Sequence, residues 1–509
     1  MEGQSSLPSV PTETDAAGQM RNLERARALL RSERFAECQT VCETILHRDP
    51  SHRGALFLLG ATRARLNDLP GALPLFETLT QLDPAHGNGW LQRGLCLIGL
   101  PRFAEAAECP RQSTILQPDI AIAHYHHGGA LAFLGRYTEA LPTLDRARVL
   151  APANPSIQAL YATALKWTRG PDAAMRQFQI LTETFPDFSP GWVGEALLHL
   201  ALGEYEEGWK LHEWGLEGPN CGLRPEIARL PRWSGQSVPH GASILVHSDA
   251  GLGDAIQFCR LIPLAAATGA RVSLLMPRSL ARLMRSLAGI DQVLVEGEPV
   301  PECDFQCPLL SLPFALRITL DTIPGVAPYL HPTADLIAAW RGRLAAVSDL
   351  RVGLVWSAAA RTAEPWAAAY GRRRSLPLDA LAPLAAVSGI AFVSLQFGTG
   401  AEQAKHPPAD MVLHDFGESI GDFEETGAVI ANHDLVISVD TSTAHLAGAI
   451  GEPVWLMSAF DQDWRWILGR ADSPWYPMHL IFRQATSGDW ASVVHDVANA
   501  LLDYAAGCR

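Results

Sequence analysis

A proline recurs every 34 residues through the first two-fifths of the chain, and this strict period limits what the region can form. The prolines are Pro50, Pro84, Pro118, Pro152 and Pro186. A period of 20 to 50 residues is typical of solenoid proteins, in which each repeat is one small unit of secondary structure. Proline cannot continue a helix, so it marks the end of each unit. The period therefore predicts stacked pairs of helices joined by short turns.

Other positions keep the same period, and their residue types fit close helix packing. Small residues allow two helices to approach, and a bulky residue precedes each small one in the second helix. The pattern is that of the tetratricopeptide repeat. The glycines are Gly60, Gly94 and Gly128, the alanines Ala72, Ala106, Ala140 and Ala174, and the bulky residues Phe35, Leu69, Phe103 and Tyr137.

The sixth unit, from Ser189 to about Glu217, keeps the period but turns aromatic at Tyr205, Trp209 and Trp214. Terminal repeats are atypical because they cover the end of the repeat core or contact a neighbour. We expect this unit to dock on the next domain. The expected organisation is a disordered tail at 1–18, tetratricopeptide repeats at 19–218, a linker at 219–242, a first lobe at 243–340 and a second lobe at 341–509.

Composition excludes several classes of protein. The formal net charge of −14 argues against a nucleic-acid partner, which would require a basic surface. No run of about 18 apolar residues is present, so no transmembrane segment is expected. The nine cysteines include no CxxC pair and no zinc-binding spacing, which favours reduced, buried thiols, no metal and a cytoplasmic location.

Beyond the Pro- and Gly-rich linker, strands and helices alternate, which predicts parallel α/β sheets. In the first lobe we expect strands at Ser243–His247, Arg271–Met276 and Gln292–Val295, with helices at Asp254–Ala267 and Ser279–Leu287. In the second lobe we expect strands at 351–357, 391–397, 435–440 and 453–458, with helices at 378–387, 422–433, 443–449 and 490–504. Two such Rossmann-like lobes would enclose a cleft at the carboxyl ends of their strands, where ligands bind open α/β sheets.

The first candidate site is the turn that follows the strand Ser243–His247. Gly251 and Gly253 would let the backbone approach a ligand, and Asp254 would begin the next helix beside the cleft. Asp is also a common N-cap, which explains its presence without a function. The turn is not GxGxxG, and no acidic residue follows at the dinucleotide spacing, so NAD is not expected.

The second candidate site is Asp440, Thr441, Ser442 and His445, between an apolar strand and a helix. Free N–H groups at a helix start, together with hydroxyls, could bind a pyrophosphate. His445 could donate a hydrogen bond to a phosphate. The alternative interpretation is hydroxyl capping of the helix and a packed histidine.

A basic run, Arg372–Arg374, precedes Ser375 and is the third candidate site. The guanidinium group suits bidentate contacts with phosphate, so the run could bind phosphate charge. The alternative is a solvated loop. If the run binds phosphate, we expect Arg374 and Ser375 to lie with the Asp440–His445 segment around one diphosphate.

Together these segments resemble a known family. The region 243–484 resembles the heptosyltransferase-like glycosyltransferases of family nine, and the whole chain resembles bacterial tetratricopeptide proteins that end in that domain. The resemblance implies the GT-B fold, a nucleotide-sugar co-substrate, and neither metal nor another cofactor. It implies that Asp254 is the general base for the acceptor hydroxyl and that Asp440, Thr441 and His445 frame the donor diphosphate. The matching stretches are HSDAGLGDAIQFCRLIPL, CPLLSLP, RVGLVW, RRRSLPL, FVSLQFG, DLVISVDTSTAHLAGAIGEPVW, DWRWILGR and DSPWYP.

The chain departs from that family in two places. The segment 357–370 is rich in Ala and lacks the Asn and His that relatives have after the RVGLVW strand. Asp-Thr-Ser at 440–442 replaces Asp-Thr-Gly, so the sugar need not be a heptose. In architecture alone, repeats followed by GT-B, the chain is similar to the nucleocytoplasmic O-linked N-acetylglucosamine transferases.

Two classes of function follow. The first is a glycosyltransferase whose repeats recruit a protein or peptide acceptor, since solenoids offer concave grooves and tethering raises the local acceptor concentration. The second is a non-catalytic adaptor with a degenerate transferase domain. Heptose transfer to a glycolipid is a third interpretation, but it does not need repeats. We expect the repeats to contribute nothing to donor chemistry, so a chain that begins near Pro219 should still bind the nucleotide sugar.

Overall fold

The computed structural model describes residues 13–216, 224–248, 251–347, 350–359 and 364–507. The chain divides into two compact units, each described here by itself. The first holds residues 1–164 and 362–369, and the second holds residues 165–361 and 370–509.

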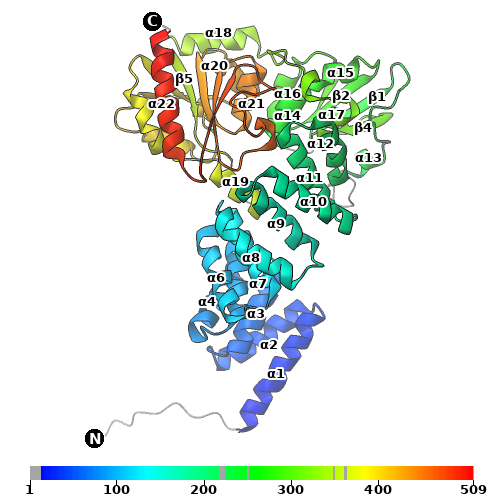
Figure 1. Cartoon of the computed structure of the whole chain (residues 1–509), viewed down its shortest axis with the longest axis vertical. Helices are drawn as coiled ribbons and strands as arrows, with labels where there is room; N and C mark the ends of the chain where they lie inside the picture. The colour runs from blue at the N-terminus through cyan, green and yellow to red at the C-terminus, as the bar shows by residue number, and fades with distance from the viewer. Residues whose placement is uncertain (1–12, 217–223, 249–250, 348–349, 360–363, 508–509) are drawn as a thin grey trace. The chain divides into compact units, whose positions relative to one another are not determined.

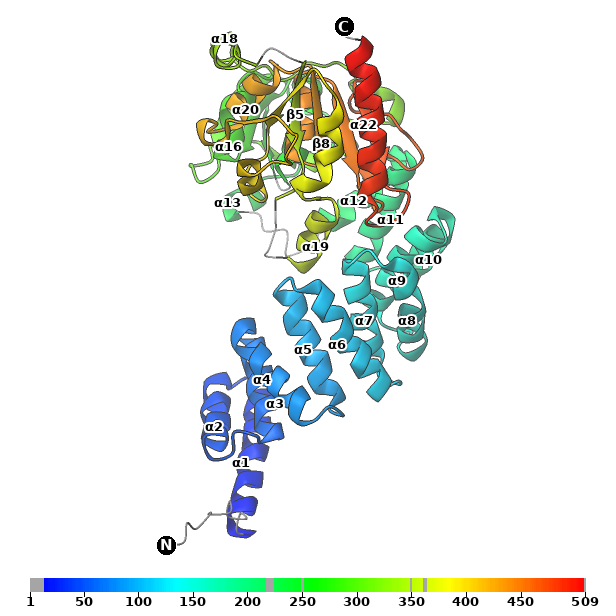
Figure 2. The same cartoon turned by 90° about the vertical axis from the view of Figure 1, so that its left-hand side faces the viewer.

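The first unit is a run of helices that pack on their neighbours along the chain (Figure 1, Figure 2). Its first helix begins at Glu13, so the expected boundary of the disordered tail at residue 18 is wrong. Residues 13–20 include Ala, Glu, Gln and Met, which favour helix; residues 1–12 of the expected tail lie outside the described residues. The helices are α1 (Glu13–Arg31), α2 (Phe35–Arg48), α3 (Arg53–Arg65), α4 (Leu69–Leu82), α5 (Gly87–Gly99), α6 (Phe103–Leu116), α7 (Ala121–Phe133), α8 (Tyr137–Leu150) and α9 (Pro155–Thr168), whose residues from Leu165 onward belong to the second unit.

The repeated small residues lie where neighbouring helices meet. A Cβ atom at Gly60 would lie 2.8 Å from Phe76 Cζ, and one at Gly128 would overlap the Leu144 side chain. Carbon atoms do not approach so closely, so only glycine fits without a shift of the neighbour. The repeated alanines Ala72, Ala106, Ala140 and Ala174 are fully buried.

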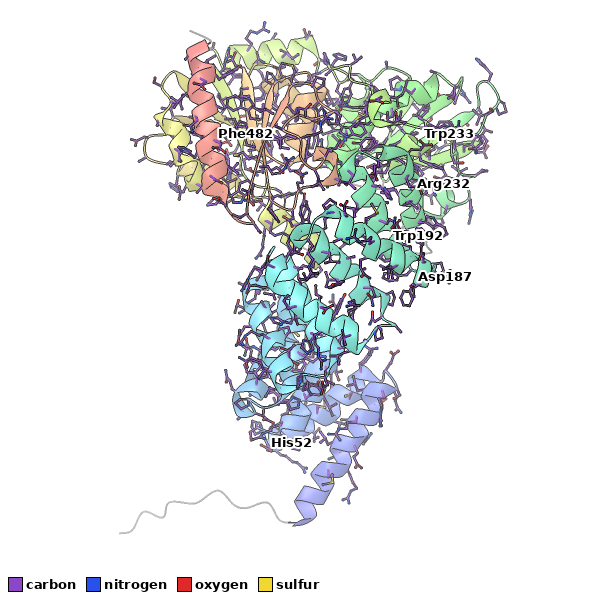
Figure 3. The ribbon with its side chains drawn as sticks, viewed as in Figure 1. His52, Asp187, Trp192, Arg232, Trp233 and Phe482 are labelled. Atoms are coloured by element: carbon purple, nitrogen blue, oxygen red, sulfur yellow. The ribbon has the colours of Figure 1, made fainter. Side chains whose placement is uncertain are left out.

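The repeated prolines have a second role that the sequence did not reveal. The carbonyl oxygens of four of the five prolines, all but Pro50, each accept a hydrogen bond from a side chain six residues later, in the following helix. The Trp90 and Trp192 indoles donate to Pro84 and Pro186 at 2.9 and 2.8 Å, and Figure 3 labels Trp192. The corresponding side chains at the intervening units are His124 on Pro118 and Gln158 on Pro152. The turn between repeats is thus tied to the helix that follows it.

The last repeats belong to the second unit and dock on its α/β part, as expected. Their helices are α10 (Pro171–Thr184), α11 (Ser189–Leu202) and α12 (Tyr205–His212), followed by a 3-10 turn, η1 (Glu213–Leu216). The C-cap of α11 is Gly203, with φ +82°, a conformation that suits glycine. Tyr205 and Trp209 are 2% exposed and pack in the same core as the sheets.

The expected linker is partly an element of the first lobe. It holds the short helix α13 (Pro225–Ala228), and the following Trp233 is only 1% exposed. The Trp233 N–H donates to the carbonyl of Gln306 at 2.8 Å, and the Gln306 N–H donates to the carbonyl of Pro231 at 2.9 Å. Arg232 pairs with Glu213, so the connector also contacts the sixth repeat (Figure 3).

The first lobe has a parallel sheet of four strands in the order β3-β2-β1-β4 (Figure 1). The helix expected at Asp254–Ala267 is interrupted by a 3-10 turn just before Pro263, which lacks the N–H that a continuous helix needs. The strands are β1 (Ser243–His247), β2 (Arg271–Met276), β3 (Ile290–Val295) and β4 (Phe305–Pro308). The helices are α14 (Leu252–Phe258), η2 (Cys259–Leu261), α15 (Ile262–Ala266), α16 (Arg278–Met284), η3 (Leu309–Ser311), α17 (Leu312–Ala315) and η4 (Leu320–Thr322).

The second lobe has a parallel sheet of six strands in the order β10-β9-β8-β5-β6-β7. Strands β7 and β10 were not predicted, and the helix expected at 378–387 is a 3-10 helix. The strands are β5 (Leu350–Val355), β6 (Ile390–Ser394), β7 (Leu413–Asp415), β8 (Leu435–Val439), β9 (Val454–Ser458) and β10 (His479–Arg483). The helices are α18 (Ala334–Arg343), α19 (Pro365–Arg373), η5 (Leu378–Ala386), η6 (Ala401–Lys405), η7 (Gly417–Ser419), α20 (Phe423–Ile430), α21 (Ser442–Ala449), η8 (Trp464–Trp466) and α22 (Trp490–Gly507).

One buried core joins the sixth repeat to both lobes. The Trp209 ring lies 5.2 Å from the Trp464 ring and 5.8 Å from the Phe258 ring, centroid to centroid. The Trp475 indole donates a hydrogen bond of 2.9 Å to the Tyr205 hydroxyl. A second core packs α22 against the larger sheet. The fold is therefore a helical repeat region followed by a part with two parallel sheets, as the sequence predicts.

Candidate functional site

The order of strands in each sheet places the first two candidate sites at corresponding points. In the smaller sheet the chain runs outward from β1 through β2 to β3 and then returns to β4 on the other side of β1. In the larger sheet it runs outward from β5 to β7 and returns to β8 beside β5. Ligands bind open α/β sheets at such switch points. Asp254 follows β1, and Asp440 follows β8.

Helices α14 and α21 bring these two sites together (Figure 1). A Cβ atom at Gly253 would lie 2.8 Å from His445 Cδ2 and 3.6 Å from Ser442 Cα. Gly253 is therefore needed for the close approach of the two helix starts, rather than for an unusual turn. The GLGD turn and the DTSTAH segment therefore lie side by side.

Asp254 caps its helix, although not as the N-cap residue that the alternative interpretation named. Gly251 is the N-cap, and Asp254 is the third residue of α14. One carboxylate oxygen of Asp254 accepts a hydrogen bond of 2.7 Å from the backbone N–H of Gly251. The other oxygen remains for a different partner.

That partner is Arg465, which sequence reasoning missed. Arg465 forms an ion pair with Asp254 and a second one, of 2.7 Å, with Asp463. The guanidinium lies against the rings of Trp464 and Phe258, at 4.5 and 5.7 Å from their centroids. Burial opposes its charge, but both carboxylates raise the pKa of Arg465, so it stays protonated. Its motif, DWRW, is visible in the sequence, but its pairing with Asp254 is not.

Asp440 is buried and lies at the centre of a polar cluster. It is 6% exposed, and burial raises the pKa of its carboxyl, whereas Arg374 opposes that rise. Arg374 lies 3.6 Å from the Asp440 carboxylate, and the Tyr370 hydroxyl donates to it at 3.4 Å. Beside it, Thr441 and Ser442 are half-buried at the start of α21.

His445 is neutral and firmly packed. Burial lowers its pKa to about 3, and the nearby Arg465 adds to this effect. Its Nδ1 lies 2.9 Å from the Tyr476 hydroxyl, and its ring stacks on Trp466 at 5.3 Å. Its Nε2 lies 3.9 Å from the Asp440 carboxylate. The packed-histidine interpretation thus describes most of its contacts, and its remaining polar atom faces Asp440.

The basic run reaches the same cluster. Arg374 contacts Asp440, so the two expected donor segments lie well within the ~15 Å that side chains of one diphosphate site can span. Arg373 pairs with Asp461 at 2.6 Å, and Arg372 is exposed. The interpretation of the run as a purely solvated loop is therefore wrong for Arg373 and Arg374.

Ser375 has a local role. Its hydroxyl accepts from the backbone N–H of Ala358 at 2.9 Å and donates to the carbonyl of Gly371 at 2.7 Å. It thus ties the basic run to the chain that leaves β5. Of the Ala-rich segment 357–370, residues 360–363 lie outside the described residues. Its last part belongs to α19, where Tyr370 lies beside Asp440.

Two further findings concern metal-binding groups and membrane spans among the described residues. Within the described ranges, no three His, Cys, Asp or Glu side chains are grouped so that they could hold a metal ion. Across the same residues, no helix combines the length and the apolar character that crossing a bilayer requires.

Comparison with known proteins identifies the repeats. Residues 23–86, 62–109 and 91–155 match the family described as Tetratricopeptide repeat. The N-terminal region therefore consists of tetratricopeptide repeats, a class of fold that binds other proteins along its concave face.

Over its length the chain is similar to Protein FlbA of Caulobacter vibrioides. The two are 25% identical, and the match covers 96% of this chain and 92% of that protein. The match thus includes both the repeats and the two sheets. The name of that protein states no activity.

Two solved structures are each similar to about a third of the chain. TTC0263, a thermophilic TPR protein from Thermus thermophilus, is 22% identical, with a TM-score of 0.29 over 36% of this chain and 99% of that one. MamA from Desulfovibrio magneticus RS-1 is 16% identical, with a TM-score of 0.31 over 33% of this chain and 96% of that one.

Proposed function

We propose that the two-sheet part is a metal-independent glycosyltransferase of the GT-B type, which uses a nucleotide sugar and acts on a protein recruited by the repeats. The observation that carries this proposal is the convergence of Asp254 with Arg374, Asp440 and the Thr441–Ser442 hydroxyls. These residues come from distant segments and meet where two sheets each reverse their strand order.

The donor diphosphate would bind on the side of the larger sheet. Arg374 offers a guanidinium, and the start of α21 offers backbone N–H groups and two half-buried hydroxyls. Such N–H groups favour anions. His445 is neutral, so it would act through a hydrogen bond and not through charge.

Asp254 would serve as the general base. Its carboxylate would accept the proton of the acceptor hydroxyl while the hydroxyl oxygen attacks the anomeric carbon. The bond from that carbon to the phosphate oxygen then breaks, and the diphosphate leaves with its electron pair. Arg374 and the α21 N–H groups would stabilise the charge that develops on the leaving group.

Arg465 would control when Asp254 can act. Its ion pair occupies one carboxylate oxygen of Asp254, and Asp463 offers Arg465 a second partner when Asp254 turns to the acceptor. An arginine that pairs with two carboxylates can release one of them, because the other still balances its charge.

The first test is a panel of nucleotide sugars measured by thermal unfolding of the full chain. A ligand present at a hundred times its Kd should add about 2.7 kcal/mol to the free energy of unfolding. A sugar nucleotide that stabilises the protein is then tested for transfer to proteins captured by the repeats. Absence of stabilisation by every member of the panel would contradict the proposal.

The second test addresses Asp254 itself. Asp254→Asn should leave nucleotide-sugar binding in place and lower turnover by roughly 10²–10⁴. Asp291→Asn is the matched control, because Asp291 is exposed on β3 in the same lobe. Wild-type turnover in Asp254→Asn would reduce Asp254 to a cap of α14.

A non-catalytic adaptor remains the second candidate, and one observation favours it. Both oxygens of the Asp254 carboxylate already have partners, the Gly251 N–H and Arg465. An adaptor would bind a nucleotide without transfer or hydrolysis of any sugar, and Asp254→Asn would change nothing but stability.

A further inference from the structure

Lys166 is an unusual residue in this chain. The sequence has three lysines, Lys166, Lys210 and Lys405, although Lys and Arg together number 40. The side chain of Lys210 is 63% exposed, and Lys405 is also exposed. Lys166 is half-buried in the last turn of α9, and it has no hydrogen bond or ion pair with another described residue.

Aromatic contacts fix Lys166 beside the segment that holds Arg465. Its ammonium nitrogen lies 4.6 Å from the centroid of the Trp167 ring. The Trp167 ring packs on Phe460 at 5.6 Å, and the Phe460 N–H donates to the Gln484 side chain at 3.1 Å. Phe460 is followed in the chain by Asp461 and Asp463. These are the two carboxylates whose negative charge favours the protonated form of Lys166.

The carboxylates around Lys166 already have partners. Asp461 pairs with Arg373 at 2.6 Å, and Asp463 pairs with Arg465 at 2.7 Å. Burial lowers the pKa of Lys166 to about 8, and Asp463 and Asp461 limit the fall. The other ionisable groups that face Asp463 include Arg374, Tyr370, Asp440, His445 and Tyr205. The ammonium is thus a compact cation that has no ion-pair partner among the described residues and is held in a mostly buried cluster.

We propose that Lys166 supplies a cationic contact to the anionic group of the ligand, the diphosphate of the nucleotide sugar, and that the fifth repeat thereby completes the donor site. This inference rests on the proposed function and replaces the expectation that the repeats contribute nothing to donor chemistry. A lysine suits this place because its ammonium is a point charge on a flexible stem, whose protonation responds to burial.

The proposal predicts a distinctive pH dependence. A bound diphosphate favours the protonated amine, so affinity should be greatest below pH 8 and should fall by up to about tenfold per pH unit above it. The ester-linked diphosphate of a nucleotide sugar does not itself titrate in this range. His445, with its pKa near 3, does not titrate there either.

The first experiment measures binding of UDP-N-acetylglucosamine, GDP-mannose and ADP-glucose to the full chain from pH 7 to pH 9. Lys166→Met should weaken binding at pH 7 by about 10–100-fold, as expected for a lost hydrogen bond to a charged group, and should flatten the pH profile. Lys166→Arg should restore binding and keep the profile flat, because arginine stays protonated. Lys210→Met is the control and should bind as the wild type does. Equal affinities and parallel profiles for the wild type and Lys166→Met would overturn the proposal.

The second experiment separates this proposal from the glycosyltransferase proposal. Acetylation by acetic anhydride is followed at each of the three lysines by mass spectrometry, with and without the nucleotide sugars or sulfate. Protection of Lys166 alone, by a nucleotide sugar, supports both proposals. Protection by sulfate but by no nucleotide sugar supports the anion site and contradicts the proposed function. Binding of a nucleotide sugar without protection of Lys166 overturns this inference and leaves the proposed function standing.

Discussion

The two units of the chain are stabilised in different ways. In the first unit each helix packs on helices that are close in sequence, and the small residues that allow this recur every 34 residues. In the second unit one core joins side chains from α12, β1, α14, η8 and the segment around Trp475. Repeat arrays are stabilised by nearest neighbours. The second unit depends on segments that are hundreds of residues apart, so a cut in the chain should affect the two units differently.

The largest effect should come from removing the repeats at the expected linker. A chain that begins at Pro219 loses Tyr205 and Trp209, which are buried against Trp464, Phe258 and Trp475. Burial of each large side chain contributes about 1.5–3 kcal/mol, and whole domains are stable by only about 5–15 kcal/mol. We therefore expect this truncated chain to aggregate or to lose cooperative unfolding, measured by solubility and thermal melting.

Two other truncations sharpen this comparison. A chain that begins at Pro152 keeps α9 to α12 and should retain the melting transition of the second unit. A chain that begins at Ser51 loses only α1 and α2 and should keep both transitions. Cooperative melting of the Pro219 chain at the temperature of the intact second unit would contradict the shared core.

A single substitution should reproduce part of that effect. Trp209→Ala should cost the second unit about 3–5 kcal/mol, because a large buried ring is removed from a rigid core. Phe76→Ala removes a fully buried ring from the first unit and should lower only the transition of the repeats. Denaturant melts that resolve the two transitions would show this separation. A loss in the same transition for both variants would show that the units unfold as one.

A smaller effect is expected at the donor site. Arg374→Ala should weaken nucleotide-sugar binding by about 10–100-fold, as for loss of a hydrogen bond to a charged group. The loss should shrink as salt is added, because salt screens the charge of Arg374. Arg136→Ala in the first unit is the matched control, since its contact with Glu139 is exposed. His445→Ala should also weaken binding, but without the dependence on salt. Unchanged affinity in Arg374→Ala would remove this residue from the donor site.

The smallest effect concerns low pH, which should decrease the free energy of unfolding of both units. Burial lowers the pKa of His433 in the second unit, and of His126 and His127 in the first, to about 4. The unfolded chain therefore binds protons that the folded chain does not between about pH 6.5 and about pH 4. For the well-buried His433, the free energy of unfolding should fall by up to about 1.4 kcal/mol per pH unit in that window.

Denaturant melts at pH 7, 6 and 5 measure this slope. His433→Gln should make the slope of the second unit smaller, whereas His240→Gln, at an exposed position, should not change it. An identical slope in both variants would show that His433 takes up its proton without unfolding.

The sequence predicts the repeats well because their information is local. Gly60 and Ala72 lie where the 34-residue period places them, and the structure explains each by a neighbour in the adjacent helix. The interruption before Pro263 was not predicted, although proline disfavours a continuous helix. Strand β7 was missed because its three residues are too few for a periodic pattern, and β10 because polar residues occupy both of its ends.

The candidate site was predicted only in part. Asp254 and Asp440 follow strands, and the order of strands and helices is enough to place them at one edge of each sheet. The residues that form ion pairs with these carboxylates lie far from them in the sequence. Arg465 lies 211 residues after Asp254, and Lys166 comes from a repeat helix. No period or motif connects such pairs, because they meet only through the packing of aromatic side chains such as Trp464 and Trp167.

Because the chain has only three lysines, cleavage at lysine can report where its structure opens locally. A protease that cleaves only after lysine has three sites, at Lys166, Lys210 and Lys405. Proteases cut backbone that has left its helix, so the cleavage rate reports the population of the open state. Lys405 ends a short 3-10 helix, Lys210 lies in α12, and Lys166 lies in α9 beside the Trp167–Phe460 contact. The order of cleavage should thus run from Lys405 to Lys210 to Lys166, and a ligand that fills the donor site should slow the last cut most.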